Sequence, residues 1–167
     1  ALGKIEMTGY EYNDLAGRVV RVFMGEEGLS EEVLHRLVLR SCEAFDHPYT
    51  TPVLKLRDRL YIQELFHGPT LAFKDLPLQF LGELLQYVLQ ERDQRLNIVV
   101  ATSGDTGSAA IHGVHGRPNI SIFVLHPEGR VSPVQKLQMT TVIDDNVHNI
   151  AIRGSFDDGQ AIMKTLL

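Results

Sequence analysis

Two short segments of the chain carry residues whose types and spacing could do chemistry. The first, Leu65–Asp75 (LFHGPTLAFKD), places Lys74 after an HGPT loop and at the start of a predicted long helix. Phe73 and Leu76 beside it are expected to be buried, and an amine in such a place is expensive to protonate. Since the free base of a lysine attacks carbonyl groups, Lys74 is a candidate nucleophile. The alternative is a surface lysine whose stem lies along the helix.

The second segment is ATSGDTGSAAI, which follows an apolar run and opens another predicted helix. Backbone N–H groups and hydroxyls are supplied there by Ser103, Gly104, Thr106 and Gly107. At the positive end of a helix, such groups bind a carboxylate or a phosphate. The segment matches neither the Walker loop nor the dinucleotide fingerprint. The alternative is a strand-to-helix turn capped by Asp105 or Thr102, and the Asp105 carboxylate would compete with an anionic ligand.

A nucleophilic lysine and an anion-binding turn together fit pyridoxal phosphate chemistry. The lysine would hold the cofactor as a Schiff base, and the helix end would take the carboxylate of an amino acid. From the residue types alone, this stays a suggestion.

The elements before Asn97 are predicted to be helices and one hairpin. Apolar residues at helical spacing predict a helix over Tyr12–Phe23 and a second helix capped by Ser30. The runs VLKL and LYIQEL predict two short strands in a hairpin, and the pattern of Phe73–Arg92 predicts the longest helix.

From Asn97 onward, the apolar runs NIVVA, ISIFVL and VHNIAI predict three buried strands. Helices are expected to open at the SGDTG turn, at Ser132-Pro133 and at Ser155, where Asp158 completes a capping box. Strands that alternate with helices indicate parallel βαβ units, so the fold class is α/β.

The composition argues against two classes of partner and against a membrane span. The 167 residues have a formal net charge of −5, which argues against nucleic acid or an anionic membrane as the main partner. No apolar run is long enough to span a membrane. The single cysteine, Cys42, is interpreted as a small apolar filler and suits a reducing cytoplasm.

The segments LFHGPTLAFKD, ATSGDTGSAAI and HPEGRVSPVQKLQMTTV, in this order, closely resemble threonine synthases of the bacterial and fungal type. The resemblance runs from Tyr10 to the end of NVHNIAIRGSFDDGQ. It implies the tryptophan synthase β-like fold of the fold type II pyridoxal phosphate enzymes. It also implies a cytoplasmic lyase that converts O-phospho-L-homoserine and water to L-threonine and phosphate, the last step of threonine biosynthesis.

The resemblance also implies roles for single residues. Lys74 would be the catalytic lysine that carries the cofactor and moves protons, and Asp105 would lie near the cofactor's ring hydroxyl. The substrate would contact Thr102, Ser103, Gly104, Thr106 and Gly107. His67 and Thr70 receive no role, and no metal ligand is expected.

One feature of the family is missing from the sequence. The family holds the cofactor phosphate in a second glycine-rich loop further downstream, and no such loop follows Gly107. We therefore expect the N-terminal portion of an enzyme, inactive alone. Residues 1–96 would form a helical and hairpin region with the lysine, and residues 97–167 the start of a parallel α/β domain with the SGDTG turn.

Two other functions are compatible with the same motifs. One is a related pyridoxal phosphate-dependent dehydratase or phospholyase, which eliminates without adding water at a defined carbon. The other is a catalytically idle fragment that binds partners.

Overall fold

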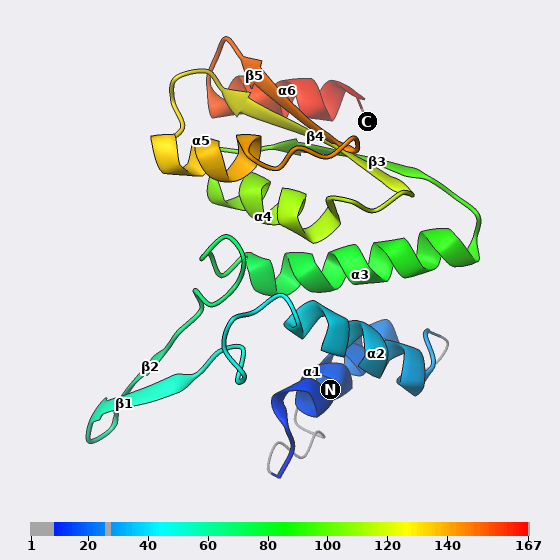
Figure 1. Cartoon of the computed structure of the whole chain (residues 1–167), viewed down its shortest axis with the longest axis vertical. Helices are drawn as coiled ribbons and strands as arrows, with labels where there is room; N and C mark the ends of the chain where they lie inside the picture. Colours follow the sequence, from blue (N-terminus) through cyan, green and yellow to red (C-terminus); the bar gives the residue numbers. More distant parts are fainter. Residues whose placement is uncertain (1–8, 26–27, 167) are drawn as a thin grey trace.

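The computed structural model describes residues 9–25 and 28–166 (Figure 1). The first part of the chain contains the helices α1 (Tyr12–Met24), α2 (Glu31–Cys42) and α3 (Asp75–Glu91) and the strands β1 (Val53–Arg57) and β2 (Leu60–Gln63). The predicted cap of α2 is present, because the hydroxyl of Ser30 accepts a hydrogen bond of 3.3 Å from the N–H of Val33.

The strands β1 and β2 form the predicted antiparallel hairpin. The hairpin projects away from the helices (Figure 1), and every residue of both strands is exposed. A two-stranded hairpin without a packed face has little stability of its own in water.

The second part of the chain is a parallel sheet with its crossover helices, as the alternating pattern predicted. Its strands β3 (Leu96–Ala101), β4 (Ile120–Pro127) and β5 (Val147–Ile152) lie in the order β3-β4-β5. Its helices are α4 (Asp105–Val114), α5 (Pro133–Thr140) and α6 (Phe156–Leu166). The caps at Ser132 and Ser155 are both present, and the carboxylate of Asp158 accepts the N–H of Ser155 at 2.7 Å.

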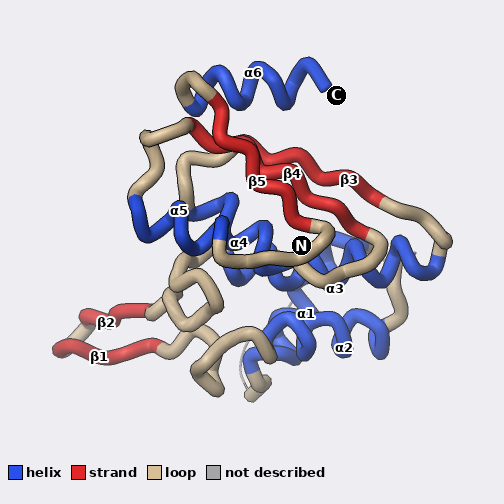
Figure 2. The backbone as a smooth tube through the Cα atoms, turned by 45° about the horizontal axis from the view of Figure 1, so that its top comes forward, coloured by secondary structure: helices blue, strands red, loops and turns tan. Residues whose placement is uncertain are grey.

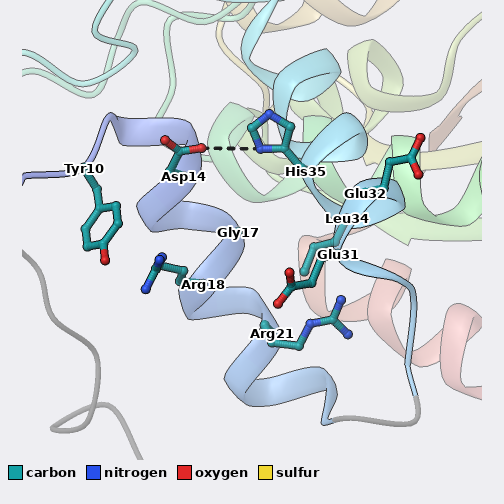
Figure 3. A pocket seen from close by; sticks show the side chains of 9 residues that line it. All are labelled: Tyr10, Asp14, Gly17, Arg18, Arg21, Glu31, Glu32, Leu34 and His35. Carbon is teal, nitrogen blue, oxygen red and sulfur yellow. Dashed lines mark ion pairs between the residues drawn. The ribbon is translucent and has the colours of Figure 1, made fainter.

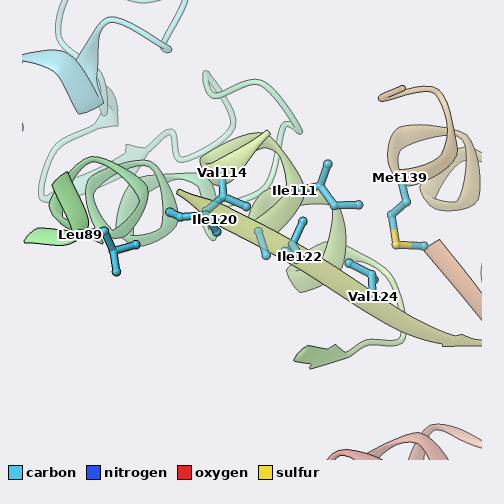
Figure 4. Close-up of a cluster of buried hydrophobic side chains, with 8 residues drawn as sticks. Leu89, Ile111, Val114, Ile120, Ile122, Val124 and Met139 are labelled. Carbon is cyan, nitrogen blue, oxygen red and sulfur yellow. The ribbon is translucent and has the colours of Figure 1, made fainter. Parts of the chain in front are cut away.

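The elements stack in layers, with α6 on one face of the sheet and α4 and α5 on the other (Figure 2). The core lies between the sheet and α4, where side chains from β4, α3, α4 and α5 meet (Figure 4). Its buried members are Leu89, Ala110, Ile111, Val114, Ile120, Ile122, Val124 and Met139. Below α4 lie α3 and then α2 and α1.

The close contact between α3 and α4 corrects one expectation about burial. A Cβ atom on Gly82 of α3 would lie 1.9 Å from the carbonyl oxygen of Gly113 on α4, so the two backbones touch. The most buried face of α3 is this one, and it consists of Asp75, Gln79, Gly82, Gln86 and Leu89. Phe73 was expected to be buried but is 55% exposed; it precedes the helix and does not belong to this face.

Candidate functional site

The loop before Lys74 is closed by a buried carboxylate. Asp75, with none of its surface exposed, accepts the N–H of Thr70 at 2.9 Å and the Thr70 hydroxyl at 2.7 Å. Leu71, which lies between Thr70 and Asp75 in the sequence, has a backbone φ of 61°, a conformation that is strained for a bulky residue. Backbone strain of this kind concentrates at functional sites, so the loop is a candidate for function on structural grounds also.

Lys74 lies at the N-cap position of α3, where the sequence predicted a helix to begin. Its side chain is half-buried, and Nζ lies 4.9 Å from the centre of the Phe73 ring. Within the described ranges, Nζ makes neither a hydrogen bond nor an ion pair. An amine that lacks a carboxylate partner remains available to react with a carbonyl group.

The SGDTG turn is built around the hydroxyl of Thr102. This residue is 2% exposed, and its Oγ1 accepts the N–H groups of Gly104 at 3.0 Å and Gly107 at 2.9 Å. Gly104 has a φ of 154°, which a residue with a side chain rarely adopts. Thr102 therefore shapes the turn between β3 and α4, and its contact with a substrate stays a prediction.

Three side chains of the turn face outward at the N-terminus of α4. Ser103, Asp105 and Thr106 are exposed, whereas Gly104 and Gly107 are buried. The N-terminus of a helix favours an anion there, and the two hydroxyls add donors. The Asp105 carboxylate is already engaged, because it accepts a hydrogen bond from the Nε2 group of Gln135 on α5.

The helix α5 brings the two predicted segments together. Gln138 Nε2 donates to the carbonyl oxygen of Thr70 at 2.9 Å, across 68 positions of the chain. Gln135, three residues earlier on the same helix, holds Asp105 across 30 positions. Sequence reasoning assigned no role to either glutamine, although both lie in the segment VSPVQKLQM, which was part of the resemblance. Two amides at i and i+3 on one helix face were the available signal.

Two histidines with lowered pKa values also lie close to these segments. Burial, and then the neighbouring His115, lowers the pKa of His112 on α4, while Asp75 and the backbone of Gln138 act in the opposite direction. Burial, and then Lys136, lowers the pKa of His126 at the end of β4. The Nδ1 atom of His126 is buried and has no partner within the described part of the chain. Both rings thus favour the neutral form.

Three cavities are lined mainly by residues of α1, α2 and α3 and lie away from these two segments. One of about 560 Å³ lies between α1 and α2, with Arg18, Arg21 and Glu31 in its wall (Figure 3). An apolar one of about 460 Å³ is lined by residues of α1, α2 and α3, including Cys42, whose pKa is raised by burial. A third, of about 510 Å³, is lined mainly by polar residues of α2 and α3. Neither Lys74 nor the SGDTG turn lines any of these three cavities.

The described residues contain no group of three or more His, Cys, Asp or Glu side chains that could hold a metal ion. No helix among them combines the length and the apolar character that a membrane crossing requires.

No family model matches the chain. Curated relatives do match: threonine synthase of Schizosaccharomyces pombe is 48% identical and that of Pseudomonas aeruginosa 47% identical, each over 93% of this chain. A protein of Xenopus laevis named threonine synthase-like 2 is 42% identical over 90% of the chain. The chain spans about a third of the length of these relatives, 32%, 33% and 32% respectively.

Solved structures agree with the sequence matches. The crystal structure of threonine synthase from yeast superposes with a TM-score of 0.88 at 42% identity, over 95% of this chain and 33% of that one. A structure described as pyridoxal phosphate-bound threonine synthase from Brucella melitensis gives a TM-score of 0.86 at 44% identity, over 95% of this chain and 34% of that one. The fold is therefore that of the corresponding third of these enzymes, as the motifs implied.

Proposed function

Because the chain belongs to the threonine synthase family, we propose that it forms the lysine-bearing part of a pyridoxal phosphate-dependent threonine synthase. The proposed reaction takes O-phospho-L-homoserine and water to L-threonine and phosphate. The observation that carries this proposal is the pair of hydrogen bonds from α5, one to the loop of Lys74 and one to the SGDTG turn. These bonds support the proposal that the two segments, which suggested one chemistry from the sequence, form one site.

The types of residue at the candidate site suit the binding of pyridoxal phosphate. The Lys74 amine has no ionic partner among the described residues, which leaves it free for covalent attachment to an aldehyde. Asp105 is the proposed neighbour of the cofactor ring. When bound, the cofactor supplies an electron sink next to the Cα atom of an amino acid.

We assign the remaining roles by chemistry. Nζ of Lys74 is the group that accepts and returns protons during the reaction. The exposed N-terminus of α4 binds the substrate carboxylate through the turn Thr102–Gly107, with the hydroxyls of Ser103 and Thr106 as further donors. Residues 1–96 thus supply the amine, and residues 97–167 supply the anion site.

The test is an assay of the complete encoded polypeptide with pyridoxal phosphate and O-phospho-L-homoserine. Release of phosphate together with formation of threonine is the expected result, and Lys74→Ala is expected to abolish both. Lys55→Ala, at an exposed lysine of the hairpin that pairs with Asp58, is the matched control and should keep full activity. Phosphate release that persists in Lys74→Ala would exclude the proposed role of this lysine.

A second candidate is a related dehydratase or phospholyase that eliminates without adding water. The motifs that contain Lys74 and the SGDTG turn are compatible with this reaction as well. The products distinguish the two: 2-oxobutanoate without threonine indicates elimination alone.

We also propose a cytoplasmic location and a small molecule as the substrate. The support for the location is the single free cysteine, Cys42, whose thiol lines an apolar cavity and has no disulfide partner within the described chain.

A further inference from the structure

The short helix α5, which lies beside α4 (Figure 1), contacts both halves of the candidate site through two of its side chains. Gln135 and Gln138 are separated by three residues, which places them next to each other on the helix surface. Their amide nitrogens donate to different segments: Gln135 to the carboxylate of Asp105, and Gln138 to the carbonyl of Thr70. The helix itself is anchored by Met139, which is completely buried in the core.

The orientation of the Gln135 amide is set by its own helix cap. Ser132 donates its hydroxyl to Oε1 of Gln135 at 2.8 Å and accepts the Gln135 N–H at 3.3 Å. With its oxygen held in this way, the amide directs its nitrogen to Asp105. Gly104 provides the space, because a Cβ atom there would lie 2.5 Å from the Gln135 side chain.

This contact bears on the competition that the sequence raised at the turn, because it engages one oxygen of the Asp105 carboxylate. A free Asp105 carboxylate at the N-terminus of α4 would itself interact with the helix end and repel an anionic ligand. The hydrogen bond from Gln135 instead directs one carboxylate oxygen toward α5.

Gln138 forms a hydrogen bond with the other segment, the loop before Lys74. Thr70 is 4% exposed, and its N–H and hydroxyl are already bound to Asp75. The Gln138 bond satisfies the remaining backbone group, the Thr70 carbonyl, and so fixes the loop before Lys74 to α5.

We propose that Gln135 and Gln138 are positioning residues: Gln135 holds the Asp105 carboxylate away from the anion-binding end of α4, and Gln138 holds the Lys74 loop in register with it. Neither glutamine takes part in bond making. The proposal rests on the proposed function for the identity of the ligands, since it assumes that Lys74 and the turn serve one cofactor and one substrate.

A charge exchange tests Gln135 in the complete encoded polypeptide. Gln135→Glu places two carboxylates against each other, and the double variant Asp105→Asn/Gln135→Glu restores an amide-to-carboxylate hydrogen bond with its direction reversed. Because one charge-assisted hydrogen bond is lost, we expect Gln135→Glu to weaken the equilibrium affinity for pyridoxal phosphate, measured by fluorescence without substrate, by about ten-fold. Because Asp105 is itself the proposed neighbour of the cofactor ring, the double variant is compared with Asp105→Asn alone. Adding Gln135→Glu to Asp105→Asn is expected to change the affinity by about two-fold or less.

The same variants are then assayed for KM and kcat with O-phospho-L-homoserine. A rise in KM for Gln135→Glu that exceeds the fall in kcat, and that is smaller when the same change is made in Asp105→Asn, supports the proposal. Unchanged cofactor affinity in Gln135→Glu would overturn the role of Gln135, and so would an equal loss of affinity when Gln135→Glu is added to Asp105→Asn. A parent protein that binds the cofactor but forms no threonine contradicts the proposed function alone, because the affinity measurement needs no substrate.

Gln138→Met tests the second contact, since it keeps the side-chain length and removes the donor. It is expected to slow trapping of the cofactor on Lys74 by borohydride about five-fold, with Gln90→Met, at an exposed glutamine of α3, as the control. Equal trapping rates in Gln138→Met and the parent protein would refute the role of Gln138.

Discussion

Thr70 donates both its backbone N–H, at 2.9 Å, and its hydroxyl, at 2.7 Å, to the completely buried carboxylate of Asp75. The two residues bracket the loop that leads into α3, so this single contact sets the path of the chain on which Lys74 lies. Asp75 is the first residue of α3. The structure shows that it satisfies two donors of the preceding loop instead of its own helix.

Asp75→Asn is expected to lower the free energy of unfolding by about 1–3 kcal/mol, because the amide offers an N–H group to one of the two Thr70 donors and leaves it unsatisfied. Urea unfolding measures this difference. Thr70→Ser, which keeps both donors and loses only a methyl group, should cost about 1 kcal/mol or less. If Asp75→Asn unfolds at the urea concentration of the parent, the carboxylate does not hold the loop.

Lys74 is expected to carry the cofactor. After borohydride treatment of the complete polypeptide with pyridoxal phosphate, peptide mass spectrometry should find the pyridoxyl group on Lys74. Lys74→Ala should lower turnover by about 10²-fold or more, because the proton transfers lose their base. A label on Lys55 or Lys136 in place of Lys74 would refute the assignment.

The contact between α3 and α4 predicts strong sensitivity at Gly82. In Gly82→Ala the new Cβ atom would lie 1.9 Å from the Gly113 carbonyl oxygen, so the helices must separate. We expect a loss of about 1–3 kcal/mol in the free energy of unfolding. The matched control is Gly17→Ala in α1, where no atom lies within 4 Å of the new Cβ atom. That change should be neutral or should stabilise by up to about 1 kcal/mol. Equal effects at the two positions would contradict the close packing.

The stability of the fold is expected to fall in mild acid. Burial lowers the pKa of His112 below its ordinary value of 6.5, so near that pH the unfolded chain binds more protons than the folded protein. The contribution of the neutral ring is therefore complete above pH 6.5 and is lost as the pH falls through the lower, folded-state pKa. Thermal unfolding between pH 7.5 and pH 5, values chosen to bracket roughly the ordinary histidine range, should show this decline.

His112→Gln should make the decline shallower, and His35→Gln, at an exposed position of α2, is the control for removing one imidazole. A slope that His112→Gln leaves unchanged would assign the decline to other groups, with His126 the next to test because burial lowers its pKa as well.

Local features of the fold could be read from the sequence because their causes are local. The hairpin, the three parallel strands and the six helices were each predicted, since the period of apolar residues differs between helix and strand. The caps at Ser30, Ser132 and Ser155 were also predicted, because a cap depends on residues within one turn of the helix. The position of Lys74 at the start of α3 was also predicted from the sequence, because it too depends on nearby residues.

Features that depend on packing between distant segments were decided only by the tertiary structure. Helical spacing could not tell which face of α3 is most buried, because the choice follows from the close approach of Gly82 to Gly113. Phe73 was likewise expected in the interior, yet 55% of its surface is exposed. The contacts of Gln135 and Gln138 span 30 and 68 positions, and the i and i+3 spacing of the two amides does not identify their partners. The residue types of the site are thus a property of the sequence, whereas its assembly is a property of the fold, because α5 must pack on the core before its two amides reach Asp105 and Thr70.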